Sequence, residues 1–220
     1  ICVLLGQGNR RFMSAMRETL EHDIGKSTAR KERLYQHIME TTEGKFSNIF
    51  LASSGSEAVE YAVRLARKRT GRYEVVSFWN SVHGRTFLAS SLSGLPVRKT
   101  GYGPLAPGIV HTPYPYCYRC PFSLAYPSCG CLCARKLEEA IKRIGPQYVA
   151  AFLAEPIVGS TVGALPPPDE YWPMVREICD RYDVLLIADE VMTGFGRTGK
   201  NFAVDHWGAI PDIIACAKGM

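Results

Sequence analysis

Residues 148–155 read YVAAFLAE, residues 169–182 read DEYWPMVREICDRY and residues 184–190 read VLLIADE. The first and third segments are apolar runs of strand length, whereas the segment between them repeats apolar residues at helical spacing. A strand, a helix and a second strand in this order are typical of a βαβ unit, in which the two strands run parallel. These three segments therefore predict an α/β fold with a mainly parallel sheet.

The same alternation of strands and helices extends to both sides of this unit. Further strands are predicted over 47–53, 73–79 and 212–218, and further helices over 9–22, 27–44, 54–71, 86–92 and 135–144. We expect an N-terminal segment, 1–24, that leads into one main domain, 25–220. Residues 94–134 are rich in Cys, Pro and Tyr without clear periodicity, which indicates a functional or partner-contacting excursion from that domain.

Composition excludes several classes of protein. The 220 residues are 46% hydrophobic and 21% charged, as in globular proteins with a buried core. No apolar run reaches the roughly 18 residues that a membrane span needs. The net charge of +5 is spread along the chain, and the one dense basic stretch, 64–72, is typical of the solvated end of a helix. We therefore expect a cytoplasmic protein without a membrane or nucleic-acid partner, whose sequence begins inside a longer gene product.

Charged residues follow three of the predicted strands directly. Glu155, Asp189 and Lys218 each come after an apolar run. The carboxyl ends of parallel strands meet at one edge of an open α/β sheet, where ligands bind. Burial of an ion there costs several kcal/mol unless a partner compensates it, so three such residues on one edge indicate a charged ligand.

The turn SSGSEA, residues 53–58, precedes a predicted helix. One interpretation is a helix cap by Ser54 or Ser56, with Glu57 in the first turn. The other is an anion site, because free N–H groups and the helix dipole favour an anion and Gly55 allows a phosphate to approach the backbone. With Asp189 and a lysine at neighbouring strand ends, we favour the anion site.

The glycine-rich stretch GFGRTGKN, residues 194–201, contains two incomplete nucleotide signatures. It matches G-x-G-x-x-G, but the residues after it lack the helical pattern that such a loop should open. It also matches the first part of a Walker A loop, but Asn201 stands where Ser or Thr is needed. We therefore interpret neither match as nucleotide binding.

A phosphate site, a buried aspartate and a lysine at a strand end suit pyridoxal phosphate (PLP). Lys218 would form a Schiff base with it, and burial would favour the neutral amine that attacks. Asp189 would pair with the pyridine nitrogen and keep the ring an electron acceptor. The helix N-terminus at Gly55 would hold the phosphate.

Five stretches resemble the class III (ω-amino acid type) aminotransferases. They are SSGSEAVEYAVRLAR (53–67), HGRTFLASSLSG (83–94), AEPIVGS (154–160), LLIADEVMTGFGRTGK (185–200) and PDIIACAKGM (211–220). The similarity runs in register from about residue 6 to the end of the chain. It implies a three-layer αβα fold, the large domain of fold-type I PLP-dependent transferases, here incomplete at its C-terminal end.

The resemblance also implies roles for individual residues. Lys218 and Asp189 are the expected catalytic residues, as the Schiff-base lysine and the partner of the pyridine nitrogen. Gly55 and Ser56 are expected to bind the phosphate, and Val191 to pack on one face of the ring.

Further positions complete the expected cofactor site and include two departures from the family. Glu155 is expected near the cofactor on the substrate side, and His83 to shape the pocket. Val82 stands where the family has an aromatic residue stacked on the ring, which implies a smaller aliphatic contact. Met192 stands where many members have a glutamine directed at the phenolic oxygen of the ring, which implies an altered acidity there.

The implied activity is PLP-dependent transamination from an amino acid or ω-amino donor to a 2-oxo acid or aldehyde, in a homodimer whose active sites lie between subunits. Family members continue beyond their lysine with segments that complete the site. An aminomutase or racemase of the same class is the alternative activity. A non-catalytic or metal-bearing remnant of such an enzyme is the alternative from another class.

Five of the eight cysteines crowd into one stretch of the excursion: Cys117, Cys120, Cys129, Cys131 and Cys133. Their C-x2-C-x8-C-x-C-x-C spacing is compatible with zinc or an iron–sulfur cluster, although a second C-x2-C pair is missing. Reduced thiols in a partly buried loop are the other interpretation. No residue is assigned as a metal ligand.

Overall fold

The computed structural model describes residues 4–22 and 28–220. The chain divides into two compact units, Ile1–Leu51 with Gly219, and Ala52–Lys218 with Met220. The boundary expected after residue 24 falls among the residues that are not described and stays a prediction. The described part of the first unit forms α1 (Arg10–His22) and α2 (Thr28–Thr41), close to the ranges that the sequence predicted.

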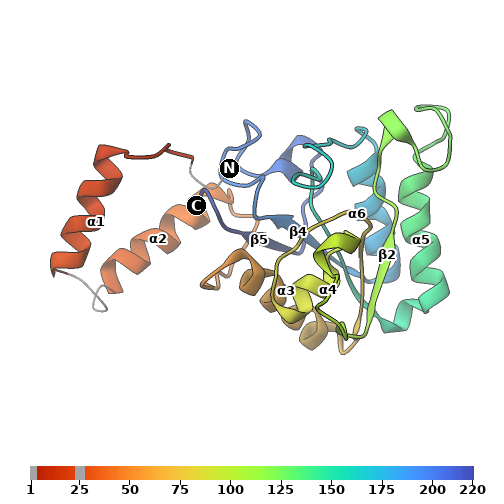
Figure 1. Cartoon of the computed structure of the whole chain (residues 1–220), viewed down its shortest axis with the longest axis horizontal. Helices are drawn as coiled ribbons and strands as arrows, with labels where there is room; N and C mark the ends of the chain where they lie inside the picture. Colours follow the sequence, from red (N-terminus) through yellow and green to blue (C-terminus); the bar gives the residue numbers. More distant parts are fainter. Residues whose placement is uncertain (1–3, 23–27) are drawn as a thin grey trace. The chain divides into compact units, whose positions relative to one another are not determined.

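The second unit is built on a parallel sheet (Figure 1). Its strands are β1 (Glu74–Phe78), β2 (Ile109–Thr112), β3 (Val149–Ala154), β4 (Leu185–Glu190) and β5 (Ile213–Cys216). They lie in the order β2-β1-β3-β4-β5, and every neighbouring pair runs parallel. The carboxyl ends of all five strands therefore meet at one edge, and the predicted α/β class is confirmed.

Helices cover both faces of this sheet. They are α3 (Gly55–Thr70), α4 (Phe87–Leu92), α5 (Leu132–Ile144) and α6 (Tyr171–Tyr182). Short 3-10 helices lie at η1 (Pro96–Arg98), η2 (Cys117–Arg119), η3 (Pro146–Tyr148) and η4 (Ala203–His206). Among the described helices, none is both long enough and apolar enough to cross a membrane.

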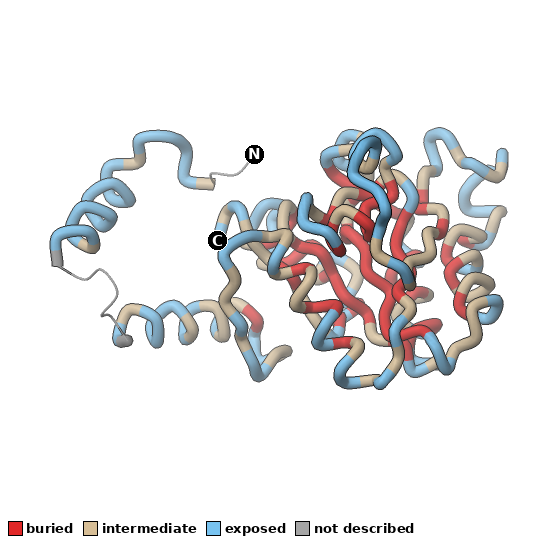
Figure 2. The backbone as a smooth tube through the Cα atoms, turned by 60° about the horizontal axis from the view of Figure 1, so that its bottom comes forward, coloured by how far each residue is buried: buried red, intermediate tan, exposed pale blue. Residues whose placement is uncertain are grey.

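The side chains of β3 point alternately to the two faces of the sheet and so contribute to two separate cores. Because successive strand residues point to opposite faces, Ala151 and Leu153 join the core beneath α3 and α4. Phe152 and Ala154 join the second core, beneath α5 and α6. All residues of β3 are buried, as the red tube of the central strands shows (Figure 2). A strand buried on both faces reads as an unbroken apolar run, which is why its sequence is so clear.

The ends of α3 are fixed by local chemistry. Ser54 is the N-cap, and its hydroxyl accepts from the Glu57 N–H at 3.2 Å. Gly71 ends the helix in the left-handed conformation, φ +70°, and its N–H donates to the Arg67 carbonyl at 2.9 Å. The start of this helix is therefore set at Gly55, at the edge of the sheet where the strands end.

Two sequence predictions need correction. Residues 47–53, all described, form no strand, and Phe50 is 58% exposed. The apolar run was too short to identify a strand without a hydrogen-bonded neighbour. The excursion over 94–134 is also more regular than predicted, because it contains β2, which pairs with β1 at the edge of the sheet. Only Thr112 of β2 is buried, so the strand lacks the apolar signature of β3 and β4.

Candidate active site

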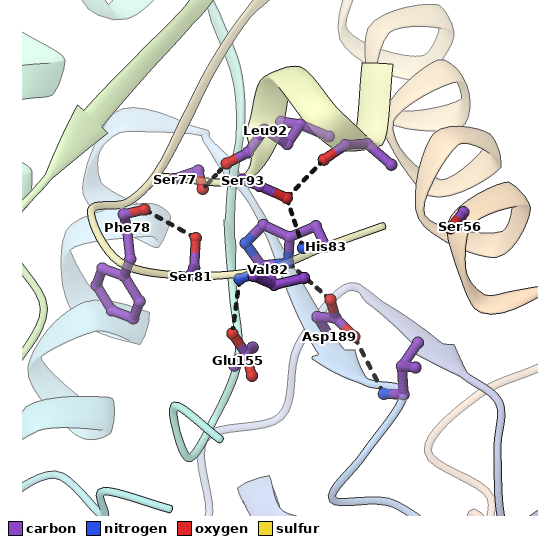
Figure 3. Close-up of polar contacts among 12 residues, drawn as sticks. Ser56, Ser77, Phe78, Ser81, Val82, His83, Leu92, Ser93, Glu155 and Asp189 are labelled. Carbon is purple, nitrogen blue, oxygen red and sulfur yellow. Dashed lines mark hydrogen bonds and ion pairs between the residues drawn. The ribbon is translucent and has the colours of Figure 1, made fainter. Parts of the chain in front are cut away.

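Asp189 and His83 form a buried pair at the carboxyl edge of the sheet. Asp189 lies at the end of β4 and is 4% exposed, and His83 lies in the loop after β1. The His83 Nδ1–H donates to Asp189 Oδ2 at 2.6 Å (Figure 3). The other oxygen, Oδ1, accepts from the Val191 N–H at 3.1 Å. Both carboxylate oxygens are thus held by the protein, which fixes the orientation of the carboxylate.

The His83 ring is held from its backbone side as well. Its N–H donates to Ser93 Oγ at 2.9 Å, and the Ser93 hydroxyl donates to the Ala89 carbonyl at 2.9 Å. The ring Nε2 is buried and has no hydrogen-bond partner among the described residues. A buried polar atom without a partner is costly, so a bound group that pairs with it would be stabilised.

Glu155 ties two loops together at the same edge. It follows β3, and its Oε1 accepts from the Val82 N–H at 3.1 Å (Figure 3). Its Oε2 accepts from the Gly159 N–H at 3.1 Å. Burial raises the pKa of the Glu155 carboxyl, and the charge of Asp189 acts in the same direction. His83 and the two N–H groups lower the pKa in opposition. Glu155 therefore fixes the backbone at Val82, one of the expected ring contacts.

The N-terminus of α3 lies against β4 and β5. A Cβ atom added to Gly55 would lie 2.9 and 3.0 Å from the two methyl groups of Val191 and 3.2 Å from the Ala217 Cβ. Only glycine fits this position without movement of its neighbours. The close approach brings Gly55, Val191 and the residue before Lys218 together.

Ser56 lies beneath the loop that carries His83. Its Oγ accepts from the Arg85 N–H at 3.2 Å. A Cβ atom on Gly84, φ +147°, would lie 2.4 Å from Ser56 Oγ, so the loop passes close over the serine. A hydroxyl that accepts one hydrogen bond still has its own hydrogen to donate.

Lys218 follows β5 and is exposed, contrary to the burial expected from the sequence. The apolar residues before it are those of the strand itself, and they say nothing about what covers a side chain two residues beyond the strand. Its φ of +54° lies in the left-handed region, which costs a non-glycine residue about 1 kcal/mol or more. Such conformations gather at functional sites.

Met192 packs over the turn after β3, at Gly159. A Cβ atom on Gly159 would lie 1.5 Å from the Met192 Cε and 3.5 Å from Glu155 Oε2. The tip of Met192 therefore occupies the space beside the Glu155 carboxylate. This arrangement contributes apolar cover to that carboxylate.

The cysteine cluster lies apart from these residues, in the excursion. Its five cysteines are all free thiols and line one small pocket together with Tyr114 and Tyr116. Burial raises the pKa of the Cys133 thiol to about 12, and the charge of Cys131 adds to the effect. Among the described residues, no group of three or more His, Cys, Asp or Glu side chains is arranged to hold a metal ion.

The expected site residues are thus gathered at one edge. Direct contacts join Asp189 to His83 and Val191, Glu155 to Val82 and Gly159, Val191 to Gly55, and Met192 to Gly159. Lys218 is joined to them through its neighbour Ala217. Sequence reasoning missed Ser93, Gly84 and Gly159. The glycines inside the HGRT and AEPIVGS motifs were a signal that the backbone is approached closely there.

Four observations indicate that the residues present fit a cofactor that carries a phosphate and a ring nitrogen. A carboxylate with a fixed orientation is available for a protonated ring nitrogen, and the helix N-terminus at Gly55 and Ser56 offers N–H and O–H donors for a phosphate. His83 has a buried ring atom without a partner among the described residues. A lysine follows the adjacent strand.

Comparisons with known proteins show similarity along nearly the whole chain. The family model described as Aminotransferase class-III matches residues 2–220. The putrescine–pyruvate aminotransferase of Pseudomonas aeruginosa is 37% identical over 232 residues, which cover 100% of this chain and 50% of that protein. The leucine/methionine racemase of Thermococcus litoralis is 34% identical over 220 residues, which cover 97% of this chain and 49% of that protein.

The fold has close counterparts among solved structures. An amine transaminase from an uncultivated Pseudomonas species, solved in its PLP-bound form, matches with a TM-score of 0.91 and 34% identity. The match covers 97% of this chain and 51% of that structure. The chain therefore spans about half the length of the relatives that it matches.

Proposed function

The chain belongs to the class III aminotransferase family, and from this premise we propose that the protein is a PLP-dependent aminotransferase. It would move an amino group from an amino acid or ω-amino donor to a 2-oxo acid or aldehyde. The observation that carries the proposal is the buried Asp189 carboxylate, held by His83 and by the Val191 N–H beside the N-terminus of α3. PLP, when bound, supplies the electron sink that stabilises negative charge at the substrate Cα.

Each residue at the sheet edge has a role in this proposal. Asp189 holds the proton on the ring nitrogen, and the His83 Nδ1–H keeps the carboxylate aimed at it. Gly55 and Ser56 bind the phosphate. Lys218 would hold the cofactor through its side-chain amine and, once that amine is free, would move the proton at the substrate Cα.

The remaining residues shape the two faces of the ring and the substrate side. Val191 packs on one face and Val82 lies at the other, where an aliphatic side chain replaces the aromatic contact found in the family. Glu155 holds the backbone of Val82 in place. Met192 covers Glu155 and offers no hydrogen bond to the phenolic oxygen of the ring.

Covalent attachment of the cofactor tests the proposal in the complete protein. We expect borohydride to fix PLP to the peptide that carries Lys218, and Lys218→Ala to abolish this adduct. Lys68→Ala is the matched control, because Lys68 is an exposed lysine on α3, away from the strand ends. An unchanged adduct in Lys218→Ala would overturn the assignment of this lysine.

A racemase or aminomutase activity is the second candidate, favoured by the similarity to the leucine/methionine racemase. The same residues would serve it, because both reactions begin by removing a proton from the substrate Cα. Product analysis with and without a 2-oxo acid acceptor separates the two activities. A transaminase needs the acceptor for turnover, whereas a racemase does not.

We also propose that the protein is a homodimer, as the family resemblance implies, and that it is cytoplasmic. Sedimentation of the complete protein measures its oligomeric state, and fractionation of cells shows which compartment contains it. A monomer that binds PLP tightly and transfers amino groups would contradict the need for a second subunit.

A further inference from the structure

Glu190 is a fully buried carboxylate to which the proposed reaction gives no role. It ends β4 next to Asp189, and its side chain points to the opposite face of the sheet because strand residues alternate. Its neighbours on that face are apolar: Ala188, Phe202 and Val204 form a small core there. Burial raises the pKa of the Glu190 carboxyl.

Hydrogen bonds from both ends of one loop satisfy this carboxylate. Its Oε2 accepts from the Thr193 hydroxyl, at the start of the loop over 191–204. Its Oε1 accepts from the Val204 N–H at 2.9 Å, at the end of the loop. The Glu190 carbonyl also accepts from the Gly194 N–H at 2.9 Å. One residue thus closes the loop at its two ends.

This loop contains the glycine-rich stretch that resembles nucleotide motifs, and the packing of the loop explains why one of these residues, Gly194, is a glycine. A Cβ atom on Gly194 would lie 2.9 Å from the Glu190 carbonyl oxygen and 3.6 Å from the Cys216 Sγ. Gly194 is therefore required by the close packing of the loop on β4 and β5. Within the loop, the Gly199 N–H donates to the Gly196 carbonyl at 3.1 Å.

The closed loop begins with residues of the proposed cofactor site. Val191 follows Glu190 directly; its N–H holds Asp189 Oδ1, and its methyl groups lie against Gly55. A shift of the loop would move the methyl groups of Val191 and release one oxygen of Asp189. Thr193 and Gly194, which Glu190 holds, lie only two and three residues beyond Val191.

We infer that Glu190 is a positioning residue: by binding both ends of the loop over 191–204, it holds Val191 against Asp189 and Gly55. This inference rests on the proposed function. The carboxylate acts across the sheet, from the face opposite the cofactor.

The test compares Glu190→Ala and Glu190→Gln in the complete protein. The alanine leaves the Val204 N–H without an acceptor. The glutamine keeps an oxygen for that N–H, and its NH2 group can donate to the Thr193 hydroxyl, which rotates to accept. We expect Glu190→Ala, which removes the acceptor of both the Thr193 hydroxyl and the Val204 N–H, to weaken PLP binding about tenfold, and Glu190→Gln to restore most of the affinity.

The second readout is the pH titration of the bound cofactor's visible absorbance, which we expect Glu190→Ala to shift because Asp189 loses a fixed partner. Ile141→Ala is the control, since Ile141 is fully buried in α5 within the core on the same face of the sheet, outside the loop. It should lower the melting temperature without changing either readout. If Glu190→Ala does not fold, Thr193→Val removes one donor and should shift both readouts by less.

The outcomes separate the inference from the proposed function. If wild-type protein binds PLP and Glu190→Ala binds it equally well with the same titration, Glu190 serves stability alone and the inference is wrong. If wild-type protein itself fails to bind PLP, the proposed function is wrong and the inference is lost with it.

Discussion

Replacement of Gly55 by alanine tests whether the start of α3 lies as close to β4 and β5 as described. Gly55 is helical, so a simple propensity argument predicts that alanine stabilises the protein by about 0.5–1 kcal/mol. The structure predicts the opposite sign, because the new Cβ would lie 2.9 and 3.0 Å from the Val191 methyl groups and 3.2 Å from the Ala217 Cβ. Overpacking of this kind costs about 1–3 kcal/mol.

A double-mutant cycle isolates this contact. Val191→Ala alone should destabilise by about 1–2 kcal/mol, since it removes two partly buried methyl groups. In Gly55→Ala/Val191→Ala the closest clash is gone, so the double variant should be at least about 1 kcal/mol more stable than the sum of the single effects. Urea unfolding of the complete apoprotein measures all four free energies of unfolding.

The sign of the change in the free energy of unfolding of Gly55→Ala decides whether α3 begins against β4. If Gly55→Ala is as stable as wild type or more stable, and its effect adds to that of Val191→Ala, then α3 does not begin against β4 as described. The phosphate site would then have to be sought elsewhere. Gly103→Ala is the control, because a Cβ atom there would meet nothing within 4 Å.

Two further predictions concern titratable groups, the buried Glu155 and the half-buried His111. In Glu155→Gln the amide can accept from only one of the N–H groups of Val82 and Gly159, so we expect a loss of about 1–3 kcal/mol. The variant should also lack one pH effect: the pKa of folded Glu155 lies above its ordinary value of 4.5, so wild-type stability falls as the pH rises from 4.5 through the folded value. Burial, aided by the charge of a nearby lysine, lowers the pKa of His111 from 6.5 to about 4. Between these two pH values the unfolded chain binds more protons than the folded chain, so the free energy of unfolding falls as the pH drops from 6.5 to about 4. His111→Gln can keep the bond to the Leu92 carbonyl and should make stability less dependent on pH in urea titrations between pH 4 and 7. An unchanged dependence would contradict the lowered pKa of His111.

The strands buried on both faces were readable from the sequence, and the edge strand was not. The runs at β3 and β4 are apolar throughout because helices cover both sides of them. The residues of β2, Ile109–Thr112, are mostly half-buried and contain a histidine, so they lack both the unbroken and the alternating pattern. Their strand character comes from hydrogen bonds to β1, and such bonds join backbones regardless of side chain.

Individual site residues were predictable where their chemistry was local. Asp189 and Glu155 were identified because a carboxylate at the end of an apolar run is unusual, and both are buried as that pattern implied. Lys218 was identified in the same way, yet its exposure differs from the expectation. The turn over 53–58 had two interpretations, a helix cap and an anion site; the structure shows that Ser54 is the cap, and the anion site stays a prediction.

The sequence by itself determined the fold class, the strand ends that carry charge and the close approach at Gly55, because each depends on residues near one another in the chain. The tertiary structure decided which of these groups meet. His83 and Asp189 are 106 positions apart, and their 2.6 Å contact depends on the order of the strands in the sheet. The tertiary structure also decided that the Glu190 carboxylate contacts Thr193 and Val204, at the two ends of the loop over 191–204. The exposure of Lys218 and the contact between His83 and Asp189 both depend on how distant segments pack, and no local sequence pattern specifies that packing.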